Sequence, residues 1–325
     1  MVKRIAGVIG VLLVVVLVLF LLGPKAEVDG TVHMVDLPED LDAYLAESEA
    51  QFADLHPDVE KTIVWADSSK GKTPLSVIYL HGFSATRQEV RPFADTLAAR
   101  LGANLFYTRL TGHGRTDDAM GEATVNDWLN DTVEALRLGQ RLGKRVIVVG
   151  TSTGATLGIW LAAQQKMGQD LMALVFISPN FALKDPNARL LLWPWGKHLA
   201  TWIIGPYRTW TPHNEEQRKY WTTRYPSHTL VTMMSLVDYV NHTDLGAIQT
   251  PTLVIYSPND QVIDAEQVAA RFVDLGSGYK RLVAIEEAGN PSNHVLAGDI
   301  LSPNETLPLV DTTLTFLAPL LTDIP

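Results

Sequence analysis

The stretch Arg145-Val-Ile-Val-Val-Gly-Thr-Ser152-Thr-Gly154 carries a β-branched run directly into the pattern G-x-S-x-G. Residues 155–166, which follow it, have the length and composition of a helix. A serine at the tip of a sharp strand-to-helix turn needs small neighbours two positions away on each side, because strand and helix pass closely there. An ordinary glycine-bounded turn is the alternative, but the flanking strand and helix favour a nucleophile elbow. We therefore predict that Ser152 is a nucleophile.

Short β-branched runs alternate with helix-length segments on both sides of this elbow. Predicted helices lie between most of the predicted strands, for example at residues 86–101, 125–142 and 264–275. Buried strands that alternate with helices imply a mostly parallel sheet with helices on both faces, which is an α/β architecture. The predicted strands cover residues 61–66, 75–80, 104–109, 145–149, 172–178, 252–256 and 281–285.

The alternation stops between Ser178 and Thr252, where the sequence offers no convincing strand. A structureless loop of that length would be unusual in a compact domain. We therefore predict a helical cap over residues 181–248, inserted between two parts of a core that covers residues 59–180 and 249–325. The cap is rich in tryptophans, which we expect to shape an apolar pocket together: Trp193, Trp195, Trp202, Trp210 and Trp221.

A serine nucleophile needs a base to take its proton and an acid to orient that base. On this kind of elbow, the acid and then the histidine follow the serine in the chain. Asp260 comes just after the predicted strand 252–256, and the nearby Asp264 is the rival acid, although it suits the start of the next helix. His294 is the only one of the nine histidines that follows Asp260. The predicted triad is Ser152, Asp260 and His294.

The oxyanion of an acyl-transfer intermediate needs N–H donors that are already in place. One donor is the residue after the nucleophile, Thr153, and the other comes from the loop after an earlier strand. That loop contains His81-Gly82-Phe83, and we predict Phe83 as the donor because Gly82 lets the backbone bend toward the substrate. We expect His81 to have a structural role.

At these motifs the chain resembles the α/β-hydrolases, and among them the branch of monoacylglycerol lipases, lysophospholipases and serine aminopeptidases. His81-Gly82-Phe83 resembles the oxyanion motif of that branch, and Leu110-Thr-Gly-His-Gly-Arg115 resembles its turn after the next strand. The elbow, Asp260 and His294 match its triad positions, and the resemblance spans about residues 60–320. It implies the α/β-hydrolase fold and a mechanism without a cofactor. The cap matches only in position.

The first residues indicate a membrane anchor. Lys3 and Arg4 precede an unbroken run of apolar residues and glycine over residues 5–22, which Gly23 ends. At 1.5 Å per residue, a helix of this length would span about 27 Å, close to the hydrocarbon thickness of a bilayer. We expect a signal-anchor over residues 1–23, with a cleaved signal peptide as the alternative. The basic start should stay in the cytoplasm, which leaves the catalytic domain on the periplasmic or extracellular side.

Composition argues against several classes of function. The formal net charge is −10, so we expect no nucleic acid partner. The chain has no cysteine, which rules out disulfides, thiolate metal sites and a cysteine nucleophile. The histidines lack the spacing of metal ligands, and we assign neither a metal nor a cofactor. Residues 24–58, between the anchor and the core, are expected to form a tether with an amphipathic helix at 39–55.

The sequence therefore predicts a membrane-tethered serine hydrolase that cleaves carboxylic esters, such as a carboxylesterase, lysophospholipase or monoacylglycerol lipase. Small-molecule or lipid-like esters are the expected substrates. A serine aminopeptidase is the first alternative, since Glu215 and Glu216 in the cap could hold a substrate ammonium, although a solvated first helical turn suits them better. A non-catalytic, tethered binding protein is the second alternative, and the complete set of catalytic residues argues against it.

Overall fold

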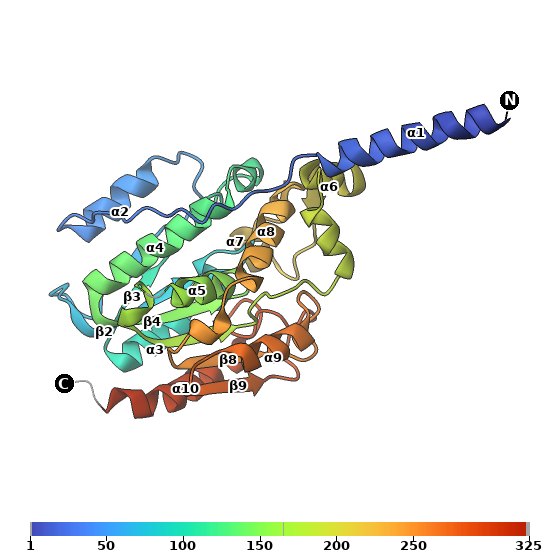
Figure 1. The fold of residues 1–325 in the computed structure, drawn as a ribbon. Coiled ribbons are helices and arrows are strands. Elements are labelled where there is room, and N and C mark those ends of the chain that lie inside the picture. The colour runs from blue at the N-terminus through green and yellow to red at the C-terminus, as the bar shows by residue number, and fades with distance from the viewer. Residues whose placement is uncertain (1, 165, 323–325) are drawn as a thin grey trace.

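Seven strands form one sheet in the computed structural model, which describes residues 2–164 and 166–322 (Figure 1). The strand order is β1-β3-β2-β4-β5-β8-β9, and β1 runs antiparallel to β3 while the other pairs are parallel. Valine, isoleucine and leucine fill the central strands, which are buried on both faces. The strands are β1 (Thr62–Val64), β2 (Thr73–Leu80), β3 (Asn104–Tyr107), β4 (Gly143–Thr151), β5 (Leu171–Ile177), β8 (Thr252–Tyr256) and β9 (Lys280–Ala284).

Helices cover both faces of this sheet, and each face has its own cluster of buried side chains (Figure 1). One face is covered by α4 (Val125–Leu142) and α5 (Thr153–Ala163), and the other by α3 (Phe93–Leu101) and α10 (Pro303–Leu321). The remaining elements of this part of the chain are α2 (Leu41–Ala50), α9 (Ala265–Asp274) and the 3-10 segments η1 (Arg87–Val90), η2 (Asp117–Gly121), η3 (Gly168–Asp170) and η5 (Leu245–Ala247).

All seven predicted strands are present, within a few residues of their expected bounds. The helix expected at 86–101 is divided into η1 and α3, because Pro92 has no N–H with which to continue the helical hydrogen bonds. The helix expected at 39–55 is shorter and forms α2. Asp40 caps its start by accepting a hydrogen bond from Ala43 N at 2.9 Å.

The segment between β5 and β8 leaves the sheet and lies over the carboxyl ends of its strands. It contains a two-stranded antiparallel ribbon of β6 (Tyr207–Thr209) and β7 (Arg224–Pro226), which the expectation of a mostly helical cap did not include. Strands of three residues are too short to show the alternation by which a strand is recognised in a sequence. The other elements of this segment are η4 (Pro186–Leu192), α6 (Gly196–Ile204), α7 (Glu215–Tyr220) and α8 (Thr229–Asn241).

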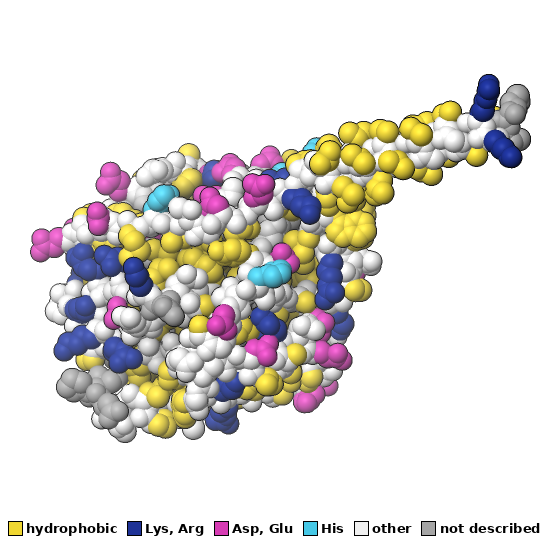
Figure 2. All heavy atoms as spheres, in the orientation of Figure 1, with side chains coloured by type: hydrophobic (Ala, Val, Ile, Leu, Met, Phe, Trp, Pro, Cys, Tyr) yellow, Lys and Arg dark blue, Asp and Glu magenta, His cyan; other side chains and the backbone are white. Residues whose placement is uncertain are grey.

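The helix α1 (Val2–Leu21) extends away from the rest of the molecule (Figure 1, Figure 2). Its residues Lys3–Leu21 have a mean hydropathy of 2.9, and 0% of this stretch is buried. A helix of this length and composition at the N-terminus can be a membrane anchor or a signal sequence. Its end reaches the segment between β5 and β8, where the rings of Phe20 and Trp193 meet edge to face with their centroids 6.1 Å apart.

Candidate active site

Ser152 lies at a strained turn between β4 and α5. Its backbone φ is +52°, in a region that residues other than glycine rarely adopt. A Cβ on Gly154 would lie 2.0 Å from Leu80 O, and a Cβ on Gly150 would lie 2.8 Å from Ala155 Cα. Both positions therefore need glycine, which is the physical reason for the G-x-S-x-G pattern. The turn presents the serine at the carboxyl end of a central strand.

His294 and Asp260 form a buried pair. His294 Nδ1 and Asp260 Oδ2 are 2.7 Å apart. The other carboxylate oxygen of Asp260 accepts hydrogen bonds from Val262 N at 2.7 Å and from Ile263 N at 3.0 Å, and the residue is only 2% exposed. With an ionised acceptor beside Nδ1, that nitrogen carries the proton, and Nε2 of His294 is left to accept another.

Asp264, the rival acid, has a different position. Its Oδ1 accepts hydrogen bonds from Glu266 N at 3.0 Å and from Gln267 N at 3.3 Å, so it caps the start of α9. The structure therefore brings Asp260, and not Asp264, to the histidine.

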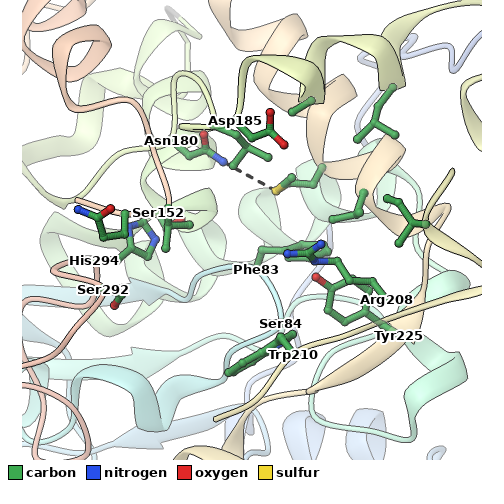
Figure 3. A pocket seen from close by; sticks show the side chains of 18 of the residues that line it. Phe83, Ser84, Ser152, Asn180, Asp185, Arg208, Trp210, Tyr225, Ser292 and His294 are labelled. Carbon is green, nitrogen blue, oxygen red and sulfur yellow. Dashed lines mark hydrogen bonds between the residues drawn. The ribbon is translucent and has the colours of Figure 1, made fainter. Parts of the chain in front are cut away.

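The pKa of His294 reflects opposing effects. Burial lowers the pKa, whereas the charge and hydrogen bond of Asp260 raise it and Glu89 raises it further, so that it lies above its usual value. Ser152 and His294 line the same cavity and are close together in Figure 3. Among the described residues, Ser152 makes no hydrogen bond to His294. Such bonds are often long in unliganded enzymes and tighten when substrate binds.

His81 holds the loop that precedes the predicted oxyanion donor. Its Nε2 accepts a hydrogen bond from Leu110 N at 3.0 Å, so Nδ1 must carry the proton and donate to Gly82 O at 2.9 Å. Burial lowers the pKa of His81 well below its usual value, which keeps the ring neutral. Gly82 O and Phe83 N belong to one peptide, whose C=O and N–H point in opposite directions. The bond to His81 therefore turns the Phe83 N–H away from that ring.

The two predicted oxyanion donors flank the nucleophile. Thr153 is the first residue of α5, so its N–H has no acceptor within the helix. The loop of Phe83 passes close on the other side, since a Cβ on Gly82 would lie 3.4 Å from Ser152 Cβ. A developing oxyanion requires backbone donors beside the serine, and the places of Thr153 and of the Phe83 loop are compatible with that role.

Glu89 is a neighbour of this site that the sequence did not reveal. It is only 1% exposed, and its Oε1 accepts hydrogen bonds from Tyr79 Oη at 2.6 Å and from Gly82 N at 2.5 Å. Burial raises the pKa of Glu89 to about 7, against the opposing effects of these two hydrogen bonds and of His294. In the sequence, Glu89 is one charged residue in a polar stretch, and no motif sets it apart.

A cavity of about 560 Å³ opens at Ser152 and His294. Polar side chains such as Asn180, Asp185 and Arg208 also reach it (Figure 3). Within residues 2–164 and 166–322, which include this cavity, no group of three His, Asp or Glu side chains could hold a metal ion. Aliphatic side chains are the largest group in the cavity wall, and most of them come from the segment between β5 and β8: Leu183, Ala188, Leu190, Leu191, Leu199, Ala200, Ile203, Ile204, Leu230 and Met233.

Two of the five tryptophans expected to shape the pocket, Trp210 and Trp221, line this cavity. Trp193 and Trp195 instead contact the end of α1, and Trp202 is 74% exposed on α6. These three do not line the cavity, so the tryptophans shape it only in part. Aliphatic side chains are the largest group in the wall. Their contribution is hard to predict from a sequence because leucine and isoleucine also fill the core.

Acidic residues of the segment between β5 and β8 bear on the choice of substrate. Glu215 lies in the first turn of α7 beside Glu216, and it pairs with Arg218 at an N–O distance of 3.2 Å. Neither glutamate lines the cavity. Asp185 does line it, and its Oδ1 accepts a hydrogen bond from Asn187 N at 2.9 Å. The acid that reaches the cavity is thus not one of the pair suggested by the sequence.

Comparisons with known proteins point to the same class of enzyme. A family model described as serine aminopeptidase, S33, matches residues 71–289. Among curated proteins, a thermostable monoacylglycerol lipase from Bacillus sp. (strain H-257) is 25% identical over 232 residues, which cover 71% of this chain and 86% of that protein.

Solved structures share the fold. One from a study of the metagenome-derived lipolytic enzymes LipS and LipT has a TM-score of 0.65 and 22% identity, and the match covers 82% of this chain and 99% of that one. A soluble variant of the monoglyceride lipase from Saccharomyces cerevisiae has a TM-score of 0.63 and 14% identity, with coverage of 80% and 91%. Because the family match spans more than half of the chain, this protein belongs to the serine aminopeptidase S33 family of α/β-hydrolases.

Proposed function

We propose that this protein cleaves carboxylic esters through an acyl-enzyme, with Ser152 as the nucleophile, His294 as the base and Asp260 as the acid that orients it. The observation that carries the proposal is the 2.7 Å contact between His294 Nδ1 and Asp260 Oδ2, beside an elbow serine in one cavity. The curated relative, named a monoacylglycerol lipase, supports an ester bond as the target.

Acylation begins when His294 Nε2 takes the proton of Ser152 Oγ and that oxygen attacks the ester carbonyl carbon. The electrons of the carbonyl double bond move to its oxygen, and the N–H groups of Phe83 and Thr153 hold the oxyanion. When the oxyanion collapses, the bond to the leaving alkoxide breaks, and the protonated His294 gives its proton to that oxygen. Ser152 is left as an acyl ester.

Deacylation repeats these steps with water. His294 takes a proton from water, the hydroxide oxygen attacks the acyl carbonyl, and collapse of the second oxyanion returns the proton to Ser152 Oγ and releases a carboxylic acid. Asp260 remains ionised and stabilises the imidazolium in both half-reactions. His294 must be neutral to act as a base, so activity should fall as the pH drops through its raised pKa.

The cavity supports a lipid-like substrate with one acyl chain. Its volume of about 560 Å³ and its aliphatic wall suit a single apolar chain. Burying each methylene of such a chain stabilises the complex by about 0.8 kcal/mol. We therefore propose monoacyl esters of small alcohols as the substrate class, and residues 181–248 as the cap that selects them.

We also propose that α1 stays in place as a single-pass anchor, with the catalytic domain on the non-cytoplasmic side. Lys3 and Arg4 precede the apolar run, as the positive-inside tendency requires. Trp195 N donates a hydrogen bond to Pro24 O at 2.7 Å, so the cap is held where the chain leaves α1. An amphiphilic ester in the same membrane would then be close to the cavity.

A serine aminopeptidase is the second candidate, favoured by the family description and by Asp185 in the cavity. That chemistry needs an acid that is free to hold the ammonium of the substrate. Oδ1 of Asp185 already accepts hydrogen bonds from Asn187 N and Nδ2, both at 2.9 Å, as the cap of η4. Only Oδ2 is then left to hold an ammonium, and the curated relative named a monoacylglycerol lipase makes the ester the better supported substrate.

The experiment that tests the proposal compares kcat/KM on p-nitrophenyl butyrate with kcat/KM on alanyl and prolyl p-nitroanilides. We expect the ester to be cleaved faster, with no turnover above the blank in Ser152→Ala. Faster cleavage of an anilide, weakened selectively by Asp185→Asn, would favour the aminopeptidase. Cleavage of neither substrate class would favour a non-catalytic binding protein.

A further inference from the structure

Glu89 of η1 lies beside the nucleophile elbow, yet the proposed mechanism gives it no role. A Cβ built on Gly82 would lie 3.0 Å from Glu89 Oε2 and 3.4 Å from Ser152 Cβ, so the carboxyl group and the serine approach the same glycine. A carboxyl group that is 1% exposed loses its hydration and needs compensating partners. Burying this carboxyl group is therefore unfavourable for folding unless its contacts stabilise the structure or assist the reaction.

The partners of Glu89 connect two parts of the site. Tyr79 Oη, which donates to Glu89 Oε1 at 2.6 Å, lies 3.0 Å from Thr151 Oγ1 and can accept a hydrogen bond from it. Thr151 directly precedes Ser152 in the elbow. The same Oε1 accepts the N–H of Gly82 at 2.5 Å. One carboxyl oxygen thus links the elbow to the oxyanion loop.

Two consecutive peptides of the oxyanion loop are held in this way. Glu89 accepts the N–H of the first, and His81 Nδ1 donates to the C=O of the second, at Gly82 O. The N–H of the second peptide is that of Phe83, the proposed oxyanion donor. With both peptides fixed, the direction of that N–H is set before substrate arrives, which is the condition for stabilising an oxyanion without reorganisation.

The segment η1 also packs against the loop of the catalytic base. A Cβ on Gly298 would lie 2.4 Å from Glu89 O, and Asp299 N donates a hydrogen bond to Arg91 O at 2.8 Å. Residues 295–302 follow His294. Glu89 therefore contacts the oxyanion loop through its side chain and the loop of the base through its backbone.

Electrostatics couple Glu89 to His294. Tyr79 and His294 lower the pKa of Glu89, and Asp260 and Glu89 raise the pKa of His294. A negative charge on Glu89 favours the protonated form of His294 and therefore raises the pKa of the base. Removing that charge while keeping the hydrogen bonds must lower the pKa of His294.

We infer that Glu89 is a positioning residue that fixes the oxyanion loop by accepting the N–H of Gly82 beside the nucleophile. The inference rests on the proposed triad, because it concerns the same site. The hydrogen bonds place the donor of Phe83. The carboxylate charge adds a second readout, because it should affect the pH range of the base.

The charge is tested by the pH dependence of kcat/KM for p-nitrophenyl butyrate. Glu89→Gln keeps an oxygen that can accept from Tyr79 and Gly82, but carries no charge. We expect its acid limb to move to lower pH by about 0.5–1 unit relative to the wild type. The matched control is Glu60→Gln, which removes a carboxylate that is 41% exposed near Arg87 and should leave the limb in place. An unmoved limb in Glu89→Gln would overturn the electrostatic role.

The hydrogen bonds are tested by Glu89→Ala, which removes the acceptor. We expect kcat to fall by about 10–100-fold with KM changed less than about threefold, since an oxyanion donor acts mainly in the transition state. An equal effect on binding and turnover, or none, would contradict the positioning role. Labelling of the wild type by a fluorophosphonate probe distinguishes failure of this inference from failure of the proposed function. If the wild type is labelled and active but the Glu89 variants are unaffected, this inference alone is refuted. If the wild type is unlabelled and inactive, the proposed function is refuted as well.

Discussion

Asp260 and Asp264 are four residues apart, yet their side chains have different hydrogen-bond partners and different roles. Oδ1 of Asp260 closes a turn by accepting the N–H groups of Val262 and Ile263, which leaves Oδ2 for His294. Oδ1 of Asp264 instead accepts N–H groups at the start of α9. Chain order and the position after a strand were sufficient to favour Asp260, because both can be determined from the sequence without the fold.

Substituting these two acids separates their roles. Asp260→Asn should lower kcat by about 10⁴-fold, because the amide no longer fixes the productive tautomer of His294. Asp264→Asn should keep near wild-type turnover, and stability should change little because asparagine is as good an N-cap as aspartate. The check is turnover of a p-nitrophenyl ester together with thermal unfolding of both variants. A strong loss of turnover in Asp264→Asn, with a mild loss in Asp260→Asn, would reassign the acid.

Glu89 marks the limit of prediction from sequence at this scale. Its burial and its contacts with Tyr79 and Gly82 arise only when η1 packs under the oxyanion loop. Nothing in the local sequence distinguishes it from the neighbouring polar residues, which are also buried by the fold. A motif reports residues with a fixed local spacing, whereas a tertiary partner such as Glu89 needs the folded chain.

At the scale of elements, the strands of the sheet were predictable and the details of the cap were not. The central strands are β-branched runs buried on both faces, and this signal is strong in a single sequence. The ribbon of β6 and β7 has no such signal because each strand is only three residues long. The tryptophans indicated the cap, but aliphatic side chains contribute more residues to its cavity wall than aromatic ones do.

The aliphatic wall predicts how activity depends on the length of the acyl chain. The rise of kcat/KM with chain length should correspond to up to about 0.8 kcal/mol for each buried methylene until the cavity is full. Leu230→Ala should alter the response to long chains more than to short ones, because Leu230 lines the cavity. Leu307→Ala is the matched control, since Leu307 is 52% exposed on α10. A flat profile in the wild type would argue against an apolar acyl pocket.

At the scale of the whole molecule, apolar surface gathers where α1 meets the catalytic domain. Apolar side chains continue from α1 onto the adjacent part of the domain (Figure 2). On α6, Trp202 is 74% exposed and Ile203 is 71% exposed. The apolar helix was plain from the sequence, because its composition is uniform over a bilayer-spanning length. The contact between this helix and the cap could not be predicted from the sequence, because Trp195 and Pro24 are far apart in the chain.

The topology can be tested directly in cells that express the full chain. If α1 is an anchor with its basic end inside, protease added to intact spheroplasts should digest the catalytic domain. A cytoplasmic protein serves as the control for spheroplast integrity. Protection of the catalytic domain until the spheroplasts are lysed would contradict the proposed orientation, and release of the intact domain into the soluble fraction would favour a cleaved signal peptide.

The central claim is that Ser152 is a nucleophile activated by His294, and covalent labelling tests it most directly. The full chain is incubated with a fluorophosphonate probe, and the modified peptide is identified by mass spectrometry. We predict one adduct, on the peptide that contains Ser152, with strongly slowed labelling in His294→Ala and none in Ser152→Ala. An adduct on another residue, or unchanged labelling of Ser152→Ala, would contradict the account.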